Sequence, residues 1–305
     1  MGINTEVTIS GFTFKNPVMP ASGTFGFGRE IASLYDLSVL GGIVSKGITR
    51  YPRKGNEPCR VAETPSGMLN SVGLQNPGVE KFILQESEFF TSLGCVSIVN
   101  IAGSSIDEYV EIAQMLDPTS CNIIELNLSC PNVKEGCMAF GSNPRSVQEV
   151  VRSVRSVTAK PLWVKLTPNT GDVISAAKAA ESEGASAISL INTLLGMAID
   201  LQTRRPVIHN NYAGLSGPAI KPVALRMVNE VYNNVRIPVI GMGGIMDADD
   251  VLEFMMAGAA AVQIGSANLV NPYACHDIID GLAEATEKLG FASLSEVTGS
   301  VKLWN

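Results

Sequence analysis

Short apolar segments rich in β-branched residues recur along the chain. Each is a continuous apolar run rather than an alternation of apolar and polar positions, which is typical of parallel strands covered on both faces. Between the later runs, apolar residues recur at three- and four-residue spacing, which predicts amphipathic helices. Strands are predicted at 17–20, 42–45, 96–100, 123–128, 162–166, 187–191, 237–240 and 261–264, and helices at 147–157, 172–183, 221–233 and 247–257.

Strand and helix alternate with no break in composition, which predicts one (β/α)8 barrel (TIM barrel) domain over residues 1–305. An open doubly wound sheet usually begins with a G-x-G-x-x-G turn, and the early glycine-rich turn at 23–28 has a different spacing. The segments 51–77 and 129–143 are longer than ordinary connections and both follow predicted strands. We therefore expect both segments on the active face of the barrel.

Composition narrows the possible partners. The 305 residues are 46% hydrophobic and 17% charged, which is enough for one sizeable core. The net charge is −7 and the basic residues are scattered, so no basic stripe offers a nucleic-acid site. No apolar run approaches the roughly 18 to 20 residues of a membrane span. The six cysteines include no C-x-x-C pair, so we expect reduced thiols in a cytoplasmic protein and no structural metal.

Polar residues and glycines stand where the predicted strands end. In a (β/α)8 barrel the catalytic groups project from these carboxyl-terminal ends. A single asparagine there is equally well explained as a helix cap, but the convergence of so many polar groups on one rim favours a site. These residues are Ser22, Lys46, Asn100, Asn127 with Cys130, Lys165, Asn192 with Thr193, Gly243 with Gly244, and Gly265 with Ser266.

Two features of the rim indicate the kind of ligand. Glycines at the ends of the last two strands, Gly243-Gly244 and Gly265, fit the phosphate site that such barrels often carry there, although close backbone packing explains either one alone. Lys165 is expected to face the barrel axis. Because a buried lysine without a carboxylate partner is costly, it should face an electron-rich ligand such as the edge of a reduced flavin.

The motif Asn127-Leu128-Ser129-Cys130-Pro131-Asn132 resembles that of the class 1 dihydroorotate dehydrogenases, together with segments at 21–23, 45–47, 70–76 and 243–244. The resemblance spans nearly the whole chain. Within that class, the segments 164–169, 192–197 and 214–219 resemble the type B, NAD-linked branch more than the fumarate-linked branch.

This resemblance implies an FMN enzyme of pyrimidine biosynthesis that oxidises (S)-dihydroorotate to orotate. Cys130 would be the catalytic base, since a thiol with a reference pKa of about 8.5 can be tuned by its surroundings; a small buried apolar cysteine is the alternative. The resemblance places the substrate among Lys46, Asn70, Ser71, Val72, Gly73, Leu74, Asn127, Asn132, Asn192 and Thr193. It places FMN among Ser22, Lys46, Gly47, Asn100, Asn127, Lys165, Ile191, Gly217, Gly243, Gly244, Gly265 and Ser266.

The chain has no dinucleotide fingerprint and no clustered set of four cysteines for an iron–sulfur centre. The type B resemblance therefore implies a partner subunit that carries FAD and a [2Fe–2S] cluster and passes electrons to NAD, in a complex with two copies of each subunit.

Other interpretations stay open from the sequence. The asparagines suit any uracil-like ring, so the substrate could be another cyclic dihydropyrimidine, and a fumarate-linked enzyme is a further alternative. A barrel that only binds a phosphorylated ligand explains the glycines but leaves Cys130, Lys46 and Lys165 without a role.

Overall fold

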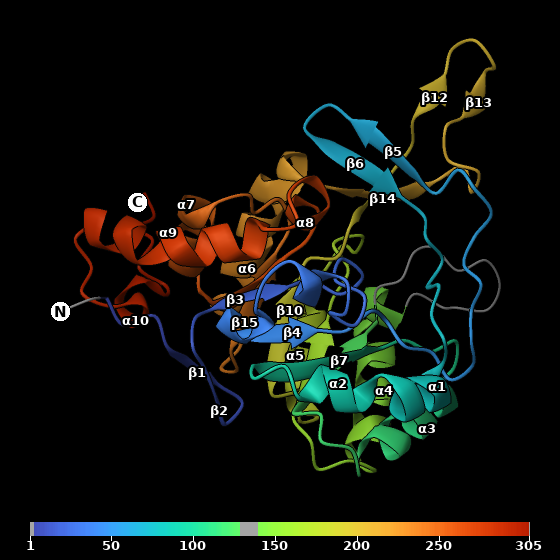
Figure 1. The fold of residues 1–305 in the computed structure, drawn as a ribbon, viewed down its shortest axis with the longest axis horizontal. Helices are drawn as coiled ribbons and strands as arrows, with labels where there is room; N and C mark the ends of the chain where they lie inside the picture. Colours follow the sequence, from blue (N-terminus) through green and yellow to red (C-terminus); the bar gives the residue numbers. More distant parts are fainter. Residues whose placement is uncertain (1–2, 129–139, 305) are drawn as a thin grey trace.

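An eight-stranded parallel sheet rolls into a barrel at the centre of the molecule (Figure 1). The computed structural model describes residues 3–128 and 140–304. The strand order is β3-β16-β15-β10-β9-β8-β7-β4, and Gly41 N donates to Val18 O at 3.1 Å where the first and last strands meet. The strands are β3 Val18–Pro20, β4 Gly42–Val44, β7 Val96–Ile101, β8 Ile123–Asn127, β9 Leu162–Lys165, β10 Ala187–Leu190, β15 Val239–Met242 and β16 Ala259–Ile264. The predicted barrel and its eight strands are confirmed.

Helices cover the outside of the barrel, with α1–α4 on one side and α7–α10 on the other (Figure 1). The amphipathic helices α3, α5 and α7 each follow a capping side chain, Ser105, Asp172 or Asp247, that accepts from a backbone N–H three residues on. The helices are α1 Val79–Gln85, α2 Ser87–Thr91, α3 Ile106–Leu116, α4 Pro144–Arg155, α5 Val173–Ser182, α6 Lys221–Tyr232, α7 Ala248–Met256, α8 Ala267–Val270, α9 Ala274–Lys288 and α10 Leu294–Val297. The four predicted helices correspond to α4–α7 and are confirmed.

One apolar side chain from each strand fills the part of the barrel nearer the amino-terminal ends of the strands. The antiparallel hairpin β1–β2 (Val7–Ile9 and Phe12–Phe14) packs against this layer, and Phe14 stacks on Trp163 with ring centroids 6.1 Å apart. The layer is fully buried and consists of Met19, Val44, Ile98, Ile123, Trp163, Ala187, Ile240 and Ala261.

The next inward position of each strand lies two residues further along, because side chains alternate across a strand. In this second layer polar residues replace most of the apolar ones. Its members are Ala21, Lys46, Asn100, Glu125, Lys165, Ser189, Met242 and Gln263. The strand period therefore places a polar layer directly above an apolar plug.

A small antiparallel sheet lies beyond the carboxyl-terminal ends of the barrel strands, at the top of Figure 1. It consists of β5 Val61–Thr64, β6 Gly67–Asn70, β14 Ala213–Ser216 and β11 Leu194–Gly196 in the order β11-β14-β6-β5. The hairpin of β12 Ile199–Asp200 and β13 Arg205–Pro206 projects beyond it. The segment 51–77 was expected as a long loop, and this is corrected: it contains the hairpin of β5 and β6, and β6 also pairs with β14, which is distant in sequence.

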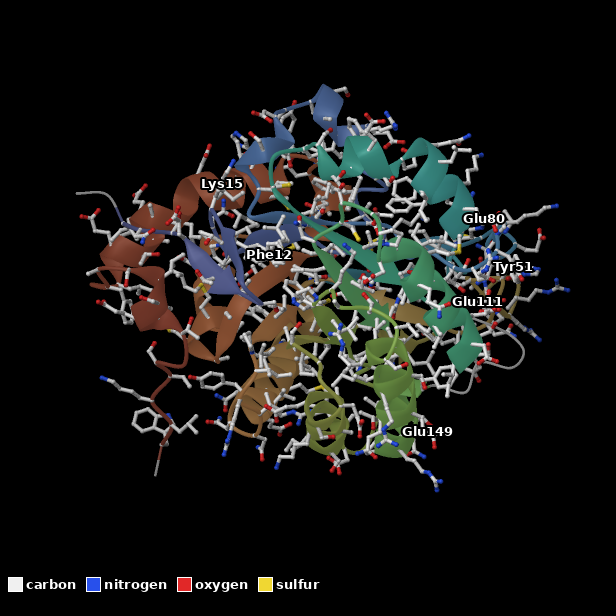
Figure 2. The ribbon with its side chains drawn as sticks, turned by 90° about the horizontal axis from the view of Figure 1, so that it is seen from below. Phe12, Lys15, Tyr51, Glu80, Glu111 and Glu149 are labelled. Atoms are coloured by element: carbon white, nitrogen blue, oxygen red, sulfur yellow. The ribbon has the colours of Figure 1, made fainter. Side chains whose placement is uncertain are left out.

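The start of the segment 51–77 is anchored to the outer helices. Arg50 donates to Glu80 of α1 at 2.9 Å and to Glu111 of α3 at 2.7 Å, and its guanidinium lies 4.9 Å from the centre of the Tyr51 ring. Tyr51, Glu80 and Glu111 lie together at one edge of the molecule (Figure 2). Among the described residues, no helix is long and apolar enough to cross a membrane.

Candidate active site

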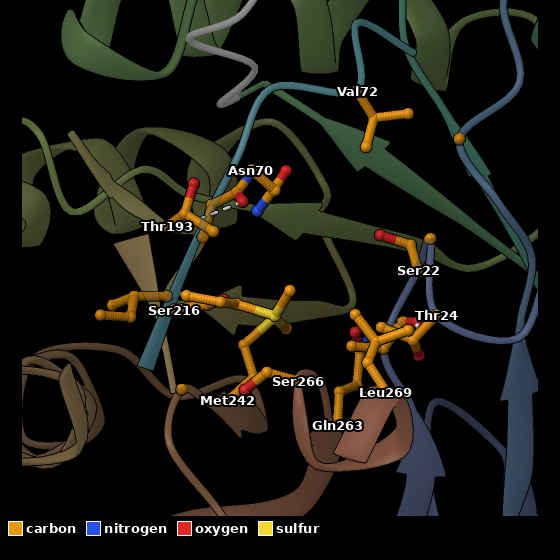
Figure 3. A pocket seen from close by; sticks show the side chains of 18 of the residues that line it. Ser22, Thr24, Asn70, Val72, Thr193, Ser216, Met242, Gln263, Ser266 and Leu269 are labelled. Atoms are coloured by element: carbon orange, nitrogen blue, oxygen red, sulfur yellow. Dashed lines mark hydrogen bonds between the residues drawn. The ribbon is translucent and has the colours of Figure 1, made fainter. Parts of the chain in front are cut away.

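A cavity opens at the carboxyl-terminal ends of the barrel strands, between the barrel and the small sheet (Figure 3). Asn70 and Thr193 lie on one side of it, and Ser22 and Thr24 lie on the other (Figure 3). The predicted site residues that line it are Ser22, Lys46, Gly47, Asn70, Val72, Gly73, Leu74, Asn100, Asn127, Lys165, Ile191, Asn192, Thr193, Gly217, Gly243, Gly244, Gly265 and Ser266.

Three predicted site residues are not placed at this cavity. Ser71 is buried beside it, where its hydroxyl accepts from Asn56 Nδ2 at 3.0 Å and from Asn210 Nδ2 at 3.2 Å, so its side chain holds the loop rather than lining the cavity. Cys130 and Asn132 lie outside the described residues.

The cavity also has lining residues that the sequence analysis did not single out. Gln263 could have been found, because it is a polar residue two positions after an inward alanine of an apolar strand. Val61 and Met68 come from the β5–β6 hairpin of the small sheet, and β6 pairs with β14, which is distant in sequence. The complete set is Ala21, Gly23, Thr24, Val61, Met68, Ser216, Ile220, Met242, Gln263 and Leu269.

Lys165 forms part of the cavity floor. Its side chain is nearly fully buried, and its Nζ donates to Ser22 Oγ at 3.3 Å. Burial lowers the pKa of Lys165, while the negative charge of Glu125 acts in the opposite direction. Glu125 lies two residues before Asn127 on the neighbouring strand, where its charge acts on Lys165 without forming an ion pair among the described residues.

Glu125 lies beneath the cavity and is fully buried. Its carboxylate accepts from Asn100 Nδ2 at 2.6 Å, from Ser189 Oγ at 2.7 Å and from Gln263 Nε2 at 2.8 Å. The two amide carbonyl oxygens, Asn100 Oδ1 and Gln263 Oε1, are buried and find no hydrogen-bond partner among the described residues. Buried acceptors normally have a partner, so these two oxygens are suited to a ligand that carries N–H donors.

Glycines shape the wall formed by the last barrel strands. Gly217, Gly243 and Gly244 have φ values of 101°, 124° and 82°, a region that favours glycine. A Cβ on Gly244 would lie 2.8 Å from Gly217 O, whereas a Cβ on Gly265 would meet no atom within 4 Å. Close backbone packing therefore requires glycine at position 244, and the backbone at Gly265 borders open space, as a bound phosphate group requires.

The other strand ends at the cavity present amides and a cation. Asn127 O accepts from Tyr109 Oη at 2.7 Å, and Asn192 Nδ2 lies 3.5 Å from Asn127 Oδ1. Lys46 is half-buried; burial lowers its pKa, and the positive charge of Arg60 acts in the same direction. These strand ends combine neutral donors and acceptors with one ammonium, which suits a polar ring that bears a negative group.

The chain was compared with known proteins. The model of the family described as dihydroorotate dehydrogenase matches residues 4–286. A relative from Thermoanaerobacter pseudethanolicus is 54% identical over 301 residues, which are 99% of this chain and 100% of the relative. Relatives from Alkaliphilus metalliredigens and Geobacillus kaustophilus are 52% and 51% identical; the matches cover 98% and 96% of this chain and 99% and 94% of the relatives.

All three relatives are named dihydroorotate dehydrogenase B (NAD(+)), catalytic subunit. Enzymes of the matched family are flavin-dependent. The family match covers most of the chain, and the relatives align along nearly their whole length. On this similarity, and on a barrel whose cavity gathers polar groups at its strand ends, the chain belongs to the dihydroorotate dehydrogenase family.

Proposed function

We propose that this chain oxidises (S)-dihydroorotate to orotate, in pyrimidine biosynthesis, as the FMN-bearing catalytic subunit of an NAD-linked enzyme. One structural observation carries the proposal. A single cavity combines a glycine-lined wall, amides beside an ammonium, and a floor formed by a buried lysine and two carbonyl oxygens that have no partner among the described residues. Residues 1–305 would form one FMN-binding domain.

The residues fit FMN. The phosphate would lie against Gly243, Gly244, Gly265 and Ser266, which all line the cavity, with open space beside Gly265. The ring would lie on the floor, near Lys165 and the carbonyl oxygens of Asn100 and Gln263. Bound FMN supplies the acceptor for the hydride that leaves C6 of the substrate.

The substrate carries a carboxylate, ring N–H groups and ring carbonyls. Asn70, Asn127 and Asn192 each offer both a donor and an acceptor, so they can satisfy the ring without adding charge. The ammonium of Lys46 would attract the carboxylate. Asn132, Thr193 and the backbone at 72–74 would complete the substrate site, whereas Ser71 would act by holding that loop.

Cys130 would take the proton from C5, on the ring face opposite the flavin. Its thiolate is the reactive form, so its surroundings must bring its pKa toward the operating pH. The proton then leaves to solvent when the thiolate is regenerated for the next turnover.

A partner subunit would carry the electrons onward. The relatives' names combine NAD(+) with the words catalytic subunit, which supports a second subunit for electron transfer. We propose that this partner holds FAD and a [2Fe–2S] cluster and that the complex contains two copies of each chain.

The flavin content of the purified chain tests the proposal. We expect a yellow protein that releases one FMN per polypeptide on denaturation, and orotate should perturb the visible spectrum of the bound flavin. Stoichiometric FAD or NAD(P) in this chain, or no flavin after reconstitution with FMN, would contradict the proposal. A panel of dihydropyrimidines with and without a carboxylate separates dihydroorotate from an uncharged ring.

A further inference from the structure

Glu125 is a buried charged residue that no step of the proposed reaction uses. It lies in the second inward layer of the barrel, directly beneath the cavity, and does not itself line the cavity. Its carboxylate receives hydrogen bonds from three strands: Asn100 on β7, Ser189 on β10 and Gln263 on β16. A carboxylate in this setting is costly to bury unless its oxygens are hydrogen-bonded, and here they are.

The Glu125 carboxylate fixes the orientation of the side-chain amides of Asn100 and Gln263. An ionised carboxylate only accepts hydrogen bonds, so Asn100 and Gln263 must both direct their NH₂ groups toward it. Each amide then has its carbonyl oxygen on the far side of the group. Both residues line the cavity, and both carbonyl oxygens are buried without a partner among the described residues.

The floor of the cavity therefore has a fixed hydrogen-bonding pattern. Lys165 supplies donors, and the two oxygens of Asn100 and Gln263 supply acceptors. The negative charge of Glu125 also opposes the burial cost of the Lys165 ammonium. A ring that offers a carbonyl to the lysine and an N–H to the oxygens satisfies this pattern, and the imide edge of an oxidised isoalloxazine ring combines both.

We propose that Glu125 is a positioning residue that orients the Asn100 and Gln263 amides so that their carbonyl oxygens receive the flavin N3–H. This inference rests on the proposed FMN site and extends it to a residue that does not touch the cofactor. Ser189 shares the carboxylate but has no part in orienting the amides.

The substitution Glu125→Gln tests the orientation with almost no change in shape. A glutamine offers one oxygen and one NH₂ group, so only one of the two amides can keep its present orientation. The other must turn its carbonyl toward the new NH₂ and present a donor to the flavin N3–H. We expect apoprotein with Glu125→Gln to bind FMN about tenfold or more weakly, measured by quenching of FMN fluorescence.

The matched control is Ser189→Ala, which removes one hydrogen bond from the same carboxylate and leaves both amides facing it. Its FMN affinity should stay within about threefold of the wild type. A second readout follows the N3–H proton of ¹⁵N-labelled FMN by NMR. In the wild type and in Ser189→Ala this proton should exchange slowly with water, and in Glu125→Gln it should exchange faster.

The outcomes separate the two proposals. If Glu125→Gln binds FMN with wild-type affinity and keeps a protected N3–H, or if Ser189→Ala weakens FMN equally, the positioning role is contradicted. If Glu125→Gln does not fold, the N3–H exchange of FMN bound to the wild type is the deciding measurement. An N3–H that exchanges as fast as in free FMN would overturn the inference. Wild-type protein that does not bind FMN contradicts the proposed function itself.

Discussion

Side chains reach the cavity because each barrel strand alternates inward and outward positions. On β8, Ile123 belongs to the apolar plug, Glu125 lies beneath the cavity and Asn127 lines it. The same two-residue step leads from Trp163 to Lys165 on β9. A change of one position in any strand would exchange polar and apolar faces, so the residues of the site are specified by strand register.

The first residue-scale prediction concerns Cys130→Ser. A hydroxyl has a much higher pKa than a thiol, so the base stays protonated at neutral pH and its deprotonated fraction rises with pH. We expect dihydroorotate oxidation at pH 7 to fall by about 100-fold or more and to recover partly at alkaline pH, with FMN retained. Steady-state rates across pH measure this. Cys59→Ser, at an exposed thiol, is the control; wild-type turnover of Cys130→Ala at pH 7 would remove Cys130 from the mechanism.

A second residue-scale prediction concerns Lys46→Ala. If the ammonium binds the substrate carboxylate, orotate should bind about tenfold or more weakly, and uncharged uracil should lose much less. Because burial lowers the pKa of Lys46, the protonated fraction, and with it orotate affinity, should decrease at lower pH than for an exposed lysine. Titration of the flavin spectrum with each ligand measures this. Lys81→Ala is the exposed control, and equal losses of orotate and uracil would assign Lys46 to the flavin.

At the element scale, the small sheet forms the substrate side of the cavity. Its strand β6 ends at Asn70, and β14 ends at Ser216 beside Gly217. Gly67 is required where these strands meet, since a Cβ there would lie 2.3 Å from Ser216 O. The barrel and the small sheet thus contribute opposite walls of one site.

Asn169 connects the barrel to the small sheet and gives an element-scale prediction. Its Nδ2 donates to Thr193 O at 3.0 Å, and its Oδ1 accepts from Leu195 N at 2.9 Å, which holds the start of β11. Asn169→Ala should weaken orotate binding by about tenfold while FMN content stays at one per chain. Asn233→Ala, at the exposed end of α6, is the control. Loss of FMN together with orotate would show a general loss of stability instead.

At the scale of the whole molecule, the chain is expected to need its partner for NAD reduction. The isolated chain should oxidise dihydroorotate with artificial dyes and reduce NAD poorly. Addition of the proposed partner subunit should confer NAD reduction, and light scattering should give a mass of two copies of each chain. Heat-inactivated partner is the control, and rapid NAD reduction by the isolated chain would contradict the prediction.

The amino-acid sequence by itself determined the barrel strands, because a strand buried on both faces leaves a continuous apolar run that needs no knowledge of its neighbours. It also determined which residues stand at the strand ends, and most of the predicted site residues do line the cavity. Their roles, and that of Cys130, remain predictions.

Only the tertiary structure decided the rest. Strands β5 and β6 are four residues each, and β6 pairs with β14, more than 140 residues away, which no local period indicates. Ser71 lies within a predicted substrate segment, yet its hydroxyl is bound by Asn56 and Asn210. Glu125 is one acidic residue in an apolar strand. Its proposed role depends on hydrogen bonds from Asn100, Ser189 and Gln263, which the sequence does not reveal. Local patterns report the burial of a segment, whereas hydrogen bonds between distant segments exist only once the barrel closes.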